Sequence, residues 1–141
     1  MRFHGFSGAL TLSVAIATDA LIADRHNHKM RKITGAGVVT TFAGTYKGDD
    51  DGPLSSARFN QPCGVAKGPK GVWIADRDNH RLRHVANGIV TTVAGTAYSG
   101  HVNGPALKGK LSKPWGIVVA GDGAVYFADS ANHRIRKLAC P

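Results

Sequence analysis

The sequence predicts an all-β fold built from repeated small sheets, and three observations support this prediction. The chain has 141 residues, of which 18 are glycine, and its Val, Ile, Thr, Tyr and Phe residues occur in short runs bounded by Gly, Asp and Asn. The runs recur, since residues 21–45 are similar to residues 72–96, and residues 125–138 are similar to the first half of both. The repeat period is about 50 residues. This composition favours short strands over helices, and the period indicates tandem units that share a core.

Identical residues recur at constant offsets in the three units. The aspartates Asp24, Asp76 and Asp129 are separated by 52 and 53 residues, and each is followed by an Asn-His pair and an arginine. A residue needed for chemistry is rarely required once in every unit, so we expect a structural role. Each aspartate is placed to accept backbone N–H groups at a turn or a charge-assisted bond from the arginine. The other repeated residues are Asn27, His28 and Arg31, then Asn79, His80 and Arg83, then Asn132, His133 and Arg136.

The middle unit shows the expected order of elements. One strand starts at residues 64–66 and ends at the turn 68–71, and a second strand covers residues 72–75. Residues 76–79 form a turn, because Asp and Asn side chains bond their own backbone and tolerate left-handed conformations. A third strand covers residues 80–86. Because short turns join these strands, we expect them to pair antiparallel.

A fourth strand over residues 89–94 follows the dipeptide Asn87-Gly88. This dipeptide is a strong signal for a type I′ hairpin, because both central residues of that turn need positive φ. The first unit has the same four runs, with residues 34–37 in place of the Asn-Gly turn. In the third unit the fourth strand is missing, and the predicted strands are residues 115–119, 124–128 and 133–138.

Two longer connectors, residues 46–61 and 97–113, join the units and are themselves repeated, since an Asp/Asn-Gly-Pro sequence occurs in both. Repeated connectors of this length are expected to be ordered loops, with one helical turn around residues 54–58. The first connector is acidic at residues 49–51, while the second is basic. We interpret these charges as a solvated loop of mixed charge.

Four-stranded sheets in tandem, with longer loops between units than within them, describe the blades of a β-propeller. The Asp-x-x-Asn-His-Arg core with a following apolar residue, together with the Gly-x-x-x-Ala-Asp approach, resembles the NHL repeat family. The resemblance covers the chain from Gly8 onward. Such propellers usually have six blades, so the resemblance implies a partial β-propeller of about three four-stranded antiparallel blades, the last lacking its outer strand. We expect one segment over residues 1–141, with blades at about residues 8–45, 62–96 and 114–138.

The N-terminal residues have two interpretations, which the sequence leaves open together with the cellular compartment. Residues 1–17 have the basic head, apolar centre and small-residue triplet at 15–17 of a short signal sequence. They also fit the innermost strand of the first unit, with Gly8 equivalent to Gly64 and Gly116. We favour the strand, because cleavage would remove it from the repeat.

No group of residues predicts an enzyme. The sequence has no HExxH or GxSxG motif and no glycine-rich phosphate loop, and no nucleophile with a base and an orienting group can be selected. Cys63 and Cys140 lie at non-equivalent positions, which indicates neither a disulfide framework nor a CxxC metal site. His28, His80 and His133 lie on separate blades, where convergence on one ion is not favoured. We expect no metal, no cofactor and, since no apolar run of about 18 residues occurs, no transmembrane helix.

Candidate binding residues come from the geometry of a blade, in which the turn between the second and third strands and the loop to the next blade emerge on the same face. Residues that vary between units on this face are where specificity normally lies. A formal charge of +9 suits an anionic partner. Trp115 and Cys63, near the start of the innermost strands, are expected to be buried. The candidate ligand-binding residues are Arg25, His26, Arg77, Asp78, His101, Lys108, Lys110 and Lys113, with Lys47 beside them.

We therefore expect a non-catalytic interaction module that binds a protein, a peptide or another anionic ligand on this basic face. The resemblance also implies two alternatives, which are RNA binding by the basic face and a metal-dependent lyase or hydrolase of the propeller type. Three blades leave exposed sheet edges that invite pairing with another chain. The remaining blades are therefore expected from a longer chain or from self-assembly.

Overall fold

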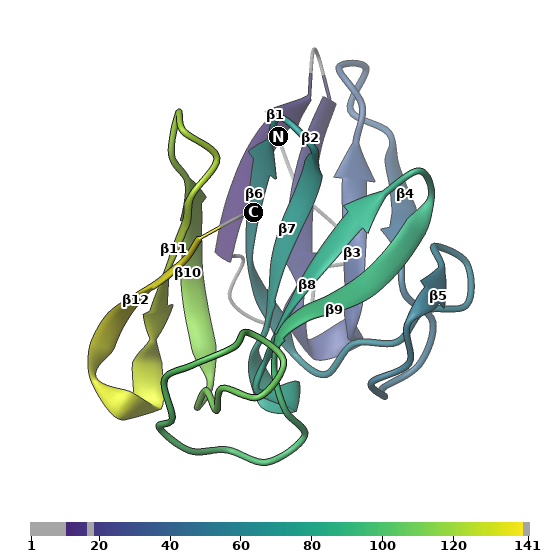
Figure 1. Ribbon diagram of the computed structural model, residues 1–141. Helices are drawn as coiled ribbons and strands as arrows, with labels where there is room; N and C mark the ends of the chain where they lie inside the picture. Colours follow the sequence, from purple (N-terminus) through teal and green to yellow (C-terminus); the bar gives the residue numbers. More distant parts are fainter. Residues whose placement is uncertain (1–10, 17–18, 140–141) are drawn as a thin grey trace.

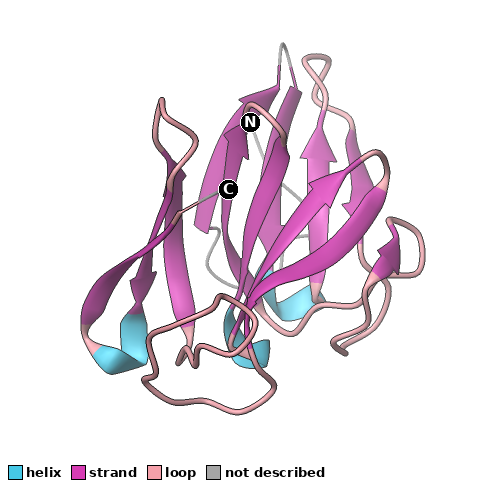
Figure 2. Ribbon diagram, in the orientation of Figure 1, coloured by secondary structure: helices cyan, strands magenta, loops and turns pink. Residues whose placement is uncertain are grey.

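The computed structural model describes residues 11–16 and 19–139. These residues form β-strands, short 3-10 helices and loops, which confirms the all-β prediction (Figures 1 and 2). The strands make three antiparallel sheets that correspond to the three sequence repeats, and we call these sheets blades 1, 2 and 3. No helix among the described residues is long and apolar enough to cross a membrane.

The strands of each blade follow one another as a meander. Blade 1 contains β1 (Thr11–Ile16), β2 (Asp19–Asp24), β3 (Lys29–Ile33) and β4 (Val39–Ala43). Blade 2 contains β6 (Pro62–Gly68), β7 (Gly71–Asp76), β8 (Arg81–Ala86) and β9 (Ile89–Gly95). Blade 3 contains β10 (Pro114–Val119), β11 (Val125–Asp129) and β12 (Arg134–Leu138). The described part of blade 3 thus lacks the outer strand, as the sequence predicts.

Local turn chemistry explains the meander. Asn87 and Gly88 have φ values of 50° and 75°, as the predicted type I′ hairpin between β8 and β9 requires. The second and third strands of each blade are joined by a short 3-10 helix, in place of the simple turn predicted from the Asp and Asn residues. Each of these helices ends at a histidine in the left-handed conformation, so the third strand of blade 2 starts at Arg81, one residue later than predicted.

The connectors are ordered and contain an unpredicted strand. Gly52–Pro53 forms β5, which pairs with β9 and becomes the outermost strand of blade 2, so that this sheet has the order β5-β9-β8-β7-β6. The helical turn expected around residues 54–58 is present as one turn, closed by a hydrogen bond of 2.9 Å from the Ala57 N–H to the Pro53 carbonyl. The sequence gives a weak signal for β5, because a strand of two residues has no periodicity.

The core lies between the blades, which stack face against face. One cluster joins Leu21, Met30 and Ala43 of blade 1 to Val65 and Ile74 of blade 2. Phe59 of the first connector closes this cluster and is fully buried. Blade 2 therefore packs one face against blade 1 and, as the next cluster shows, the other against blade 3, because a single four-stranded sheet cannot bury both of its faces alone.

The second cluster lies between blades 2 and 3. It contains Cys63, Trp73 and Leu82 on the blade 2 side, and Ile117 and Phe127 on the blade 3 side. The innermost strand β6 contacts β1 on one side and β10 on the other, so the first strands of the blades converge (Figure 1). This convergence is the arrangement of propeller blades around an axis. Residues 11–16 form the innermost strand of blade 1, while Gly8 and Cys140 lie outside the described residues.

Candidate ligand-binding face

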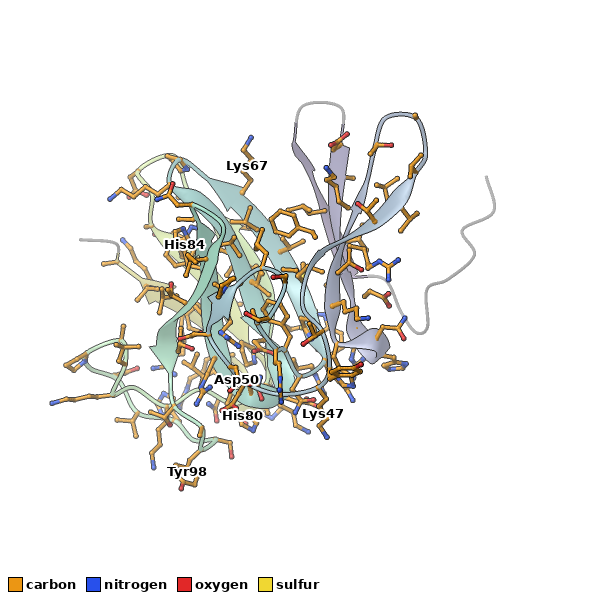
Figure 3. All side chains as sticks on the ribbon, turned by 90° about the vertical axis from the view of Figure 1, so that its right-hand side faces the viewer. Lys47, Asp50, Lys67, His80, His84 and Tyr98 are labelled. Atoms are coloured by element: carbon orange, nitrogen blue, oxygen red, sulfur yellow. The ribbon has the colours of Figure 1, made fainter. Side chains whose placement is uncertain are left out.

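The 3-10 helices and the long connectors lie at the same end of the blades, at the bottom of Figures 1 and 2. The helices are η1 (Arg25–Asn27), η2 (Arg77–Asn79) and η3 (Ser130–Asn132). Figure 3 shows Lys47, Asp50, His80 and Tyr98 at this end and Lys67 at the opposite end. We call the end with the helices and connectors the loop face. The structure thus brings the turns and connectors together as expected from the blade geometry.

The repeated aspartate, asparagine and arginine attach each connector to its blade. Asp76 is fully buried and accepts hydrogen bonds from the Asn60 N–H (2.8 Å), from Asn79 Nδ2 (2.7 Å) and from Arg83 (2.7 Å). Asn79 Nδ2 also donates to the Gly48 carbonyl at 2.7 Å. Because Asn60 and Gly48 belong to the connector before blade 2, these bonds hold that connector against the blade.

Arg83 completes the same network from β8. Its guanidinium is fully buried and donates to the carboxylates of Asp76 and Asp51 and to the carbonyls of Asp50 and Arg58, with donor–acceptor distances of 2.6–3.1 Å. All five N–H donors of the side chain are used. This satisfies a charge that would otherwise be costly to bury.

Blade 3 repeats this geometry with one change. Asp129 accepts from the Ser112 N–H (2.6 Å), from Asn132 Nδ2 (2.8 Å) and from Arg136 (2.9 Å). Arg136 also donates to Asn103 Oδ1 at 2.9 Å, where blade 2 has Asp51. In blade 1, Asn27 donates to Asp24 at 2.9–3.0 Å and Arg31 lies 3.9 Å from Asp24. Asp76 and Asp129 thus bind a connector N–H, the asparagine and the arginine, whereas Asp24 bonds the asparagine and lies at a longer ion-pair distance from Arg31.

Two of the repeated histidines, His28 and His80, connect blades 1 and 2 to the connectors that follow them. His28 and His80 have φ values of 57° and 56°, and this left-handed conformation turns their rings towards the next connector. The Nδ1 atom of His28 accepts from the Gln61 N–H at 3.1 Å, and that of His80 accepts from the Lys113 N–H at 3.2 Å. Burial, the largest cause, lowers the pKa of both histidines, which favours the neutral ring that accepts these bonds.

Two of the candidate binding residues meet at an aromatic ring from the third blade. The guanidinium carbons of Arg25 and Arg77 each lie 5.1 Å from the centre of the Trp115 ring. This distance is in the range of a cation–π interaction. Because Arg25, Arg77 and Trp115 come from blades 1, 2 and 3, the three blades meet at one cluster, which we call the Arg25–Arg77–Trp115 cluster.

Trp115 and Cys63 occupy equivalent positions near the start of the innermost strands of blades 3 and 2. Cys63 is fully buried, as predicted, whereas Trp115 is only half-buried, so the prediction of burial is wrong in part for Trp115.

The other candidate residues divide into two groups. Asp78 forms an ion pair with Arg77, and the exposed Lys113 donates its backbone N–H to His80 Nδ1 two residues before Trp115, so both lie near the cluster. His101 lies farther out, where it lines a hollow beside β12. His26 and Lys108 are exposed, and Lys110 is half-buried. The eight residues therefore do not form one site.

Sequence reasoning missed the role of Trp115 and two exposed tyrosines. Tyr46 and Tyr98 occupy similar places in the two connectors, shortly after the Gly-Thr that ends each fourth strand, and they are 81% and 75% exposed. The repeat alignment contains this signal, since a tyrosine recurs two residues before Gly48 and Gly100. Exposed aromatic residues on a loop face provide contact area for a partner.

The buried titratable groups do not form a reactive set. Burial raises the pKa of Asp76 to about 6, against the opposing effect of Arg83 and the hydrogen bonds from Asn60 and Asn79, so this carboxyl is ionised at neutral pH. Burial raises the pKa of the Cys63 thiol to about 12, which leaves the thiol protonated. Among the described residues, no three His, Cys, Asp or Glu side chains are grouped so that they could hold a metal ion.

The converging meanders and the network that joins each connector to its blade define this molecule as a segment of a β-propeller. Residues 111–138 match the family model of the NHL repeat. The chain is 33% identical over 131 residues to NHL repeat-containing protein 2 of Gallus gallus, which covers 84% of this chain and 18% of that protein. The same protein of Homo sapiens is 32% identical over 147 residues, covering 94% of this chain and 20% of that protein. These findings confirm that the chain is made of NHL repeats.

Solved structures give the same fold. A structural genomics protein of unknown function from Bacteroides thetaiotaomicron has a TM-score of 0.81 at 28% identity, covering 84% of this chain and 32% of that chain. An auxiliary nutrient binding protein from the same species has a TM-score of 0.74 at 27% identity, covering 86% and 35%. A streptogramin B lyase, at 14% identity and a TM-score of 0.61, shows the fold alone; it covers 94% of this chain and 41% of the lyase chain. The chain spans about a fifth of its curated relatives and about a third of the first two structures.

Proposed function

We propose that this NHL segment is a non-catalytic interaction module whose loop face binds an acidic segment of a protein or peptide. The observation that supports this most is the placement of Arg25 and Arg77, from successive blades, against the one ring of Trp115. A guanidinium that stacks on an aromatic face keeps its N–H donors in the plane of the group, where a carboxylate can accept two of them. The cluster therefore places the guanidinium of Arg25, which has no carboxylate partner among the described residues, beside that of Arg77, which is paired with Asp78.

The charge balance of the loop face also supports an anionic partner. The acidic residues of the first connector are paired within the protein, since Asp49 lies 3.0 Å from Arg81, Asp50 lies 3.1 Å from Arg58, and Asp51 binds Arg83. No carboxylate among the described residues pairs with Arg25, whose Nε donates to the neutral Gln61 side chain at 3.1 Å. An acidic ligand would supply the missing counter-charge.

A similar solved structure agrees with binding as the role of this fold. The auxiliary nutrient binding protein from Bacteroides thetaiotaomicron is named for binding and is 27% identical to this chain. That name supports a binding role here, and the Arg25–Arg77–Trp115 cluster provides the cationic groups that an anionic ligand needs. The fold alone would not indicate which ligand is bound, because one fold hosts many functions.

RNA binding is the second candidate, and the exposed tyrosines Tyr46 and Tyr98 favour it. Proteins that bind single-stranded RNA combine a basic groove with aromatic rings on which bases stack. The two tyrosines lie on separate connectors of the loop face, which also displays Lys47 and Lys113. An RNA ligand would need both the tyrosines and the cations, whereas an acidic peptide needs chiefly the arginines.

The test is a titration of the purified chain with an octaglutamate peptide, read from tryptophan fluorescence, since Trp115 lies in the cluster. The double variant R25Q/R77Q is expected to weaken binding at least about tenfold, as removal of charge-assisted bonds would. The matched control is K67Q/K70Q, which removes the same charge from the opposite end of the blades and is expected to leave affinity within about twofold. Equal losses in both variants would show that only net charge matters and would contradict the proposed site.

The two alternatives are tested on the same material. An oligouridine that binds more tightly than octaglutamate, with a steep loss of affinity as salt is added and a dependence on Tyr46 and Tyr98, would favour RNA. Stoichiometric zinc or calcium in the purified protein would favour a metal-dependent lyase or hydrolase. We expect the metal content to be substoichiometric and the octaglutamate affinity to be the higher of the two.

The partners are also expected to include further blades, from a longer chain or a second copy. Val118 and Ile135, on the face of blade 3 that points away from blade 2, are 56% and 73% exposed. The equivalent residues of blade 2, Ala66 and Leu82, are at most 8% exposed because blade 3 covers them. An apolar face that is covered in the other blades is a surface for the same kind of contact. Sedimentation velocity of the chain tests this: assembly that increases with concentration is expected, and the variant Ile135→Lys should reduce it.

A further inference from the structure

A pocket of about 220 Å³ lies between blades 2 and 3, at the end of the molecule opposite the loop face. Two turns line it, the one between β6 and β7 and the one between β10 and β11, both near the top of Figure 1. Trp73 of β7 and Val119 of β10 line it as well, and we call it the Trp73 pocket. Each turn joins two strands that pair antiparallel, so both walls of the pocket are held by their own sheets.

The indole N–H of Trp73 is a donor that faces this pocket without a partner. Trp73 is 7% exposed, and His84 packs against its ring with the ring centroids 4.5 Å apart, which fixes the orientation of the indole. Its N–H donates to no acceptor among the described residues and is not fully enclosed by protein atoms. A Cβ at Gly68 would lie 3.2 Å from Nε1 and 3.0 Å from Val119 Cγ1, so the glycine leaves open the space beside the N–H. A buried indole N–H usually finds an acceptor, which a ligand could supply here.

Lys70 and Asp122 place opposite charges at the opening of the Trp73 pocket. Both residues are exposed and line the pocket, Lys70 from blade 2 and Asp122 from blade 3. Within the described part of the chain they pair neither with each other nor with another charged residue. Asp122 Oδ1 accepts from the Ala124 N–H at 2.9 Å, which fixes this carboxylate in its turn. Two opposite charges that line one pocket without pairing are complementary to a ligand that carries both.

The residues that carry these groups vary between the repeats. Trp73 is equivalent to Leu21 in blade 1 and to Tyr126 in blade 3, so the repeat does not require an indole at this position. The turn Gly-Pro-Lys-Gly at residues 68–71 is equivalent to Gly-Asp-Gly-Ala at residues 121–124. Binding specificity normally lies in the residues that vary on a repeated scaffold. The Trp73 pocket is therefore a feature of this pair of blades and not of the repeat.

We propose that the Trp73 pocket binds a small zwitterion of the class of free α-amino acids. The ligand carboxylate accepts charge-assisted bonds from the Trp73 N–H and from Lys70, and its ammonium group pairs with Asp122. Pro69 and Val119 contact its short apolar part. The pocket is smaller than the roughly 300–1,000 Å³ of pockets for drug-sized ligands, which restricts it to a small molecule. It lies at the other end of the blades from the Arg25–Arg77–Trp115 cluster, so this inference does not depend on the proposed function.

Ligands with a single charge fit the Trp73 pocket less well. A simple carboxylate can accept from the Trp73 N–H and from Lys70, but it is repelled by Asp122. A simple ammonium ion can pair with Asp122, but it is repelled by Lys70 and leaves the indole N–H without an acceptor. An unpaired polar group in a site costs affinity, because the group loses its water without gaining a partner. The pocket should therefore prefer the zwitterion to either of its singly charged derivatives.

The experiment is a titration of the nitrogen-15-labelled full chain with L-alanine, read from the indole N–H resonances in two-dimensional NMR spectra. The chain has two tryptophans, and the variant Trp115→Phe identifies the resonance of Trp73. L-Alanine is expected to shift the Trp73 resonance saturably and to leave that of Trp115 unchanged. N-acetyl-L-alanine lacks the ammonium group and L-alaninamide lacks the carboxylate, so each should bind at least about tenfold more weakly.

Two variants test the charges of the opening separately. Asp122→Asn keeps an acceptor for the Ala124 N–H and should weaken L-alanine about fivefold without weakening N-acetyl-L-alanine. Lys70→Gln should weaken L-alanine to a similar extent without weakening L-alaninamide. The matched control is Lys67→Gln, which removes an exposed charge at the same end of the blades but outside the pocket, and it should leave the affinity within about twofold.

Three results would overturn the proposal. The first is a Trp73 resonance that stays unchanged up to the solubility limit of L-alanine. The second is equal affinity for L-alanine, N-acetyl-L-alanine and L-alaninamide, which would show that the two charges of the ligand are not read. The third is an unaltered preference among these three probes in both Asp122→Asn and Lys70→Gln, which would place the bound molecule elsewhere.

Discussion

Arg83 is the residue on which the network of blade 2 depends most. It is fully buried, it is the only cation within bonding distance of the buried Asp76 among the described residues, and it joins β8 to the first connector. Removing it would leave the buried Asp76 with only the Asn60 and Asn79 donors, so that this carboxyl must either stay charged without a counter-ion or take up a proton. Breaking a buried ion pair from one side is much more costly than replacing both partners, because an uncompensated charge remains.

We predict that Arg83→Met lowers the free energy of unfolding by about 3–5 kcal/mol, the range expected for a broken buried pair. The matched variant Arg136→Met should cost less, because the Arg136 side chain is 13% exposed and part of its environment is solvent. Urea denaturation followed by circular dichroism measures both. A loss below about 1 kcal/mol for Arg83→Met would mean that the pair is screened like a surface ion pair.

The histidines between blades predict a pH dependence of stability. Burial lowers the folded-state pKa of His28 and His80 below the ordinary value of 6.5. Their stabilising hydrogen bonds from Gln61 and Lys113 are therefore complete above pH 6.5 and are lost as the pH falls from there through the lowered folded pKa values. Through these histidines, the urea concentration at the midpoint of unfolding should decrease as the pH is lowered from 7.5 to 5.

The control for this pH effect is the double variant His28→Asn/His80→Asn. Asparagine tolerates the left-handed conformation at these positions and does not titrate in this range. The variant should lose the contribution of these two histidines and retain that of His84, whose pKa is also lowered by burial. It should also retain the opposite contribution of Asp76, whose folded pKa of about 6 makes protonation stabilising as the pH falls. A change of the midpoint with pH that is the same in the wild type and in this variant would show that the two hydrogen bonds contribute nothing to the pH dependence.

At the scale of the elements, the close approach of the innermost strands sets the angle between blades. A Cβ on Gly64 of β6 would lie 2.1 Å from the Trp115 carbonyl oxygen on β10, so only glycine allows this contact. Gly116 is the equivalent residue of β10, and a Cβ there would meet nothing within 4 Å. The same residue type at equivalent positions thus has different consequences, depending on whether another described blade lies beside it.

We predict that Gly64→Ala destabilises the chain by about 1–3 kcal/mol or more, as overpacking of a tight contact does. Gly116→Ala should change stability by less than about 0.5 kcal/mol, as a change at an open position does. Thermal unfolding of the two variants provides the comparison. Equal effects would indicate that strand propensity, and not the contact between β6 and β10, decides the role of this glycine.

The elements that could be predicted from sequence are those with local signals. The type I′ hairpin at Asn87-Gly88 and the repeated network around Asp76 follow from turn chemistry and from the repeat. β5 could not be predicted, because its partner β9 is distant in sequence and a two-residue strand has no pattern. The stacking on Trp115 could not be predicted either, because it depends on the angle between blades, which no single repeat encodes.

For the whole molecule, the candidate site follows from stacking the blades around an axis. Arg25 and Arg77 occupy equivalent positions in blades 1 and 2, and stacking brings both to a residue of blade 3. The internal ion pairs of residues 49–51 remove acidic charge from the same face. The loop face is therefore the end of the molecule where cations from different blades meet, and its binding depends on the blades keeping their relative positions.

The most direct test of this account is a nitrogen-15 NMR titration of the chain with octaglutamate. We predict that the largest shift changes occur at the Trp115 indole N–H and at the Arg25 and Arg77 side-chain N–H groups, with smaller changes along the two connectors. Shift changes centred on Lys67 and Lys70 at the opposite end, or spread evenly over all lysines and arginines, would contradict it.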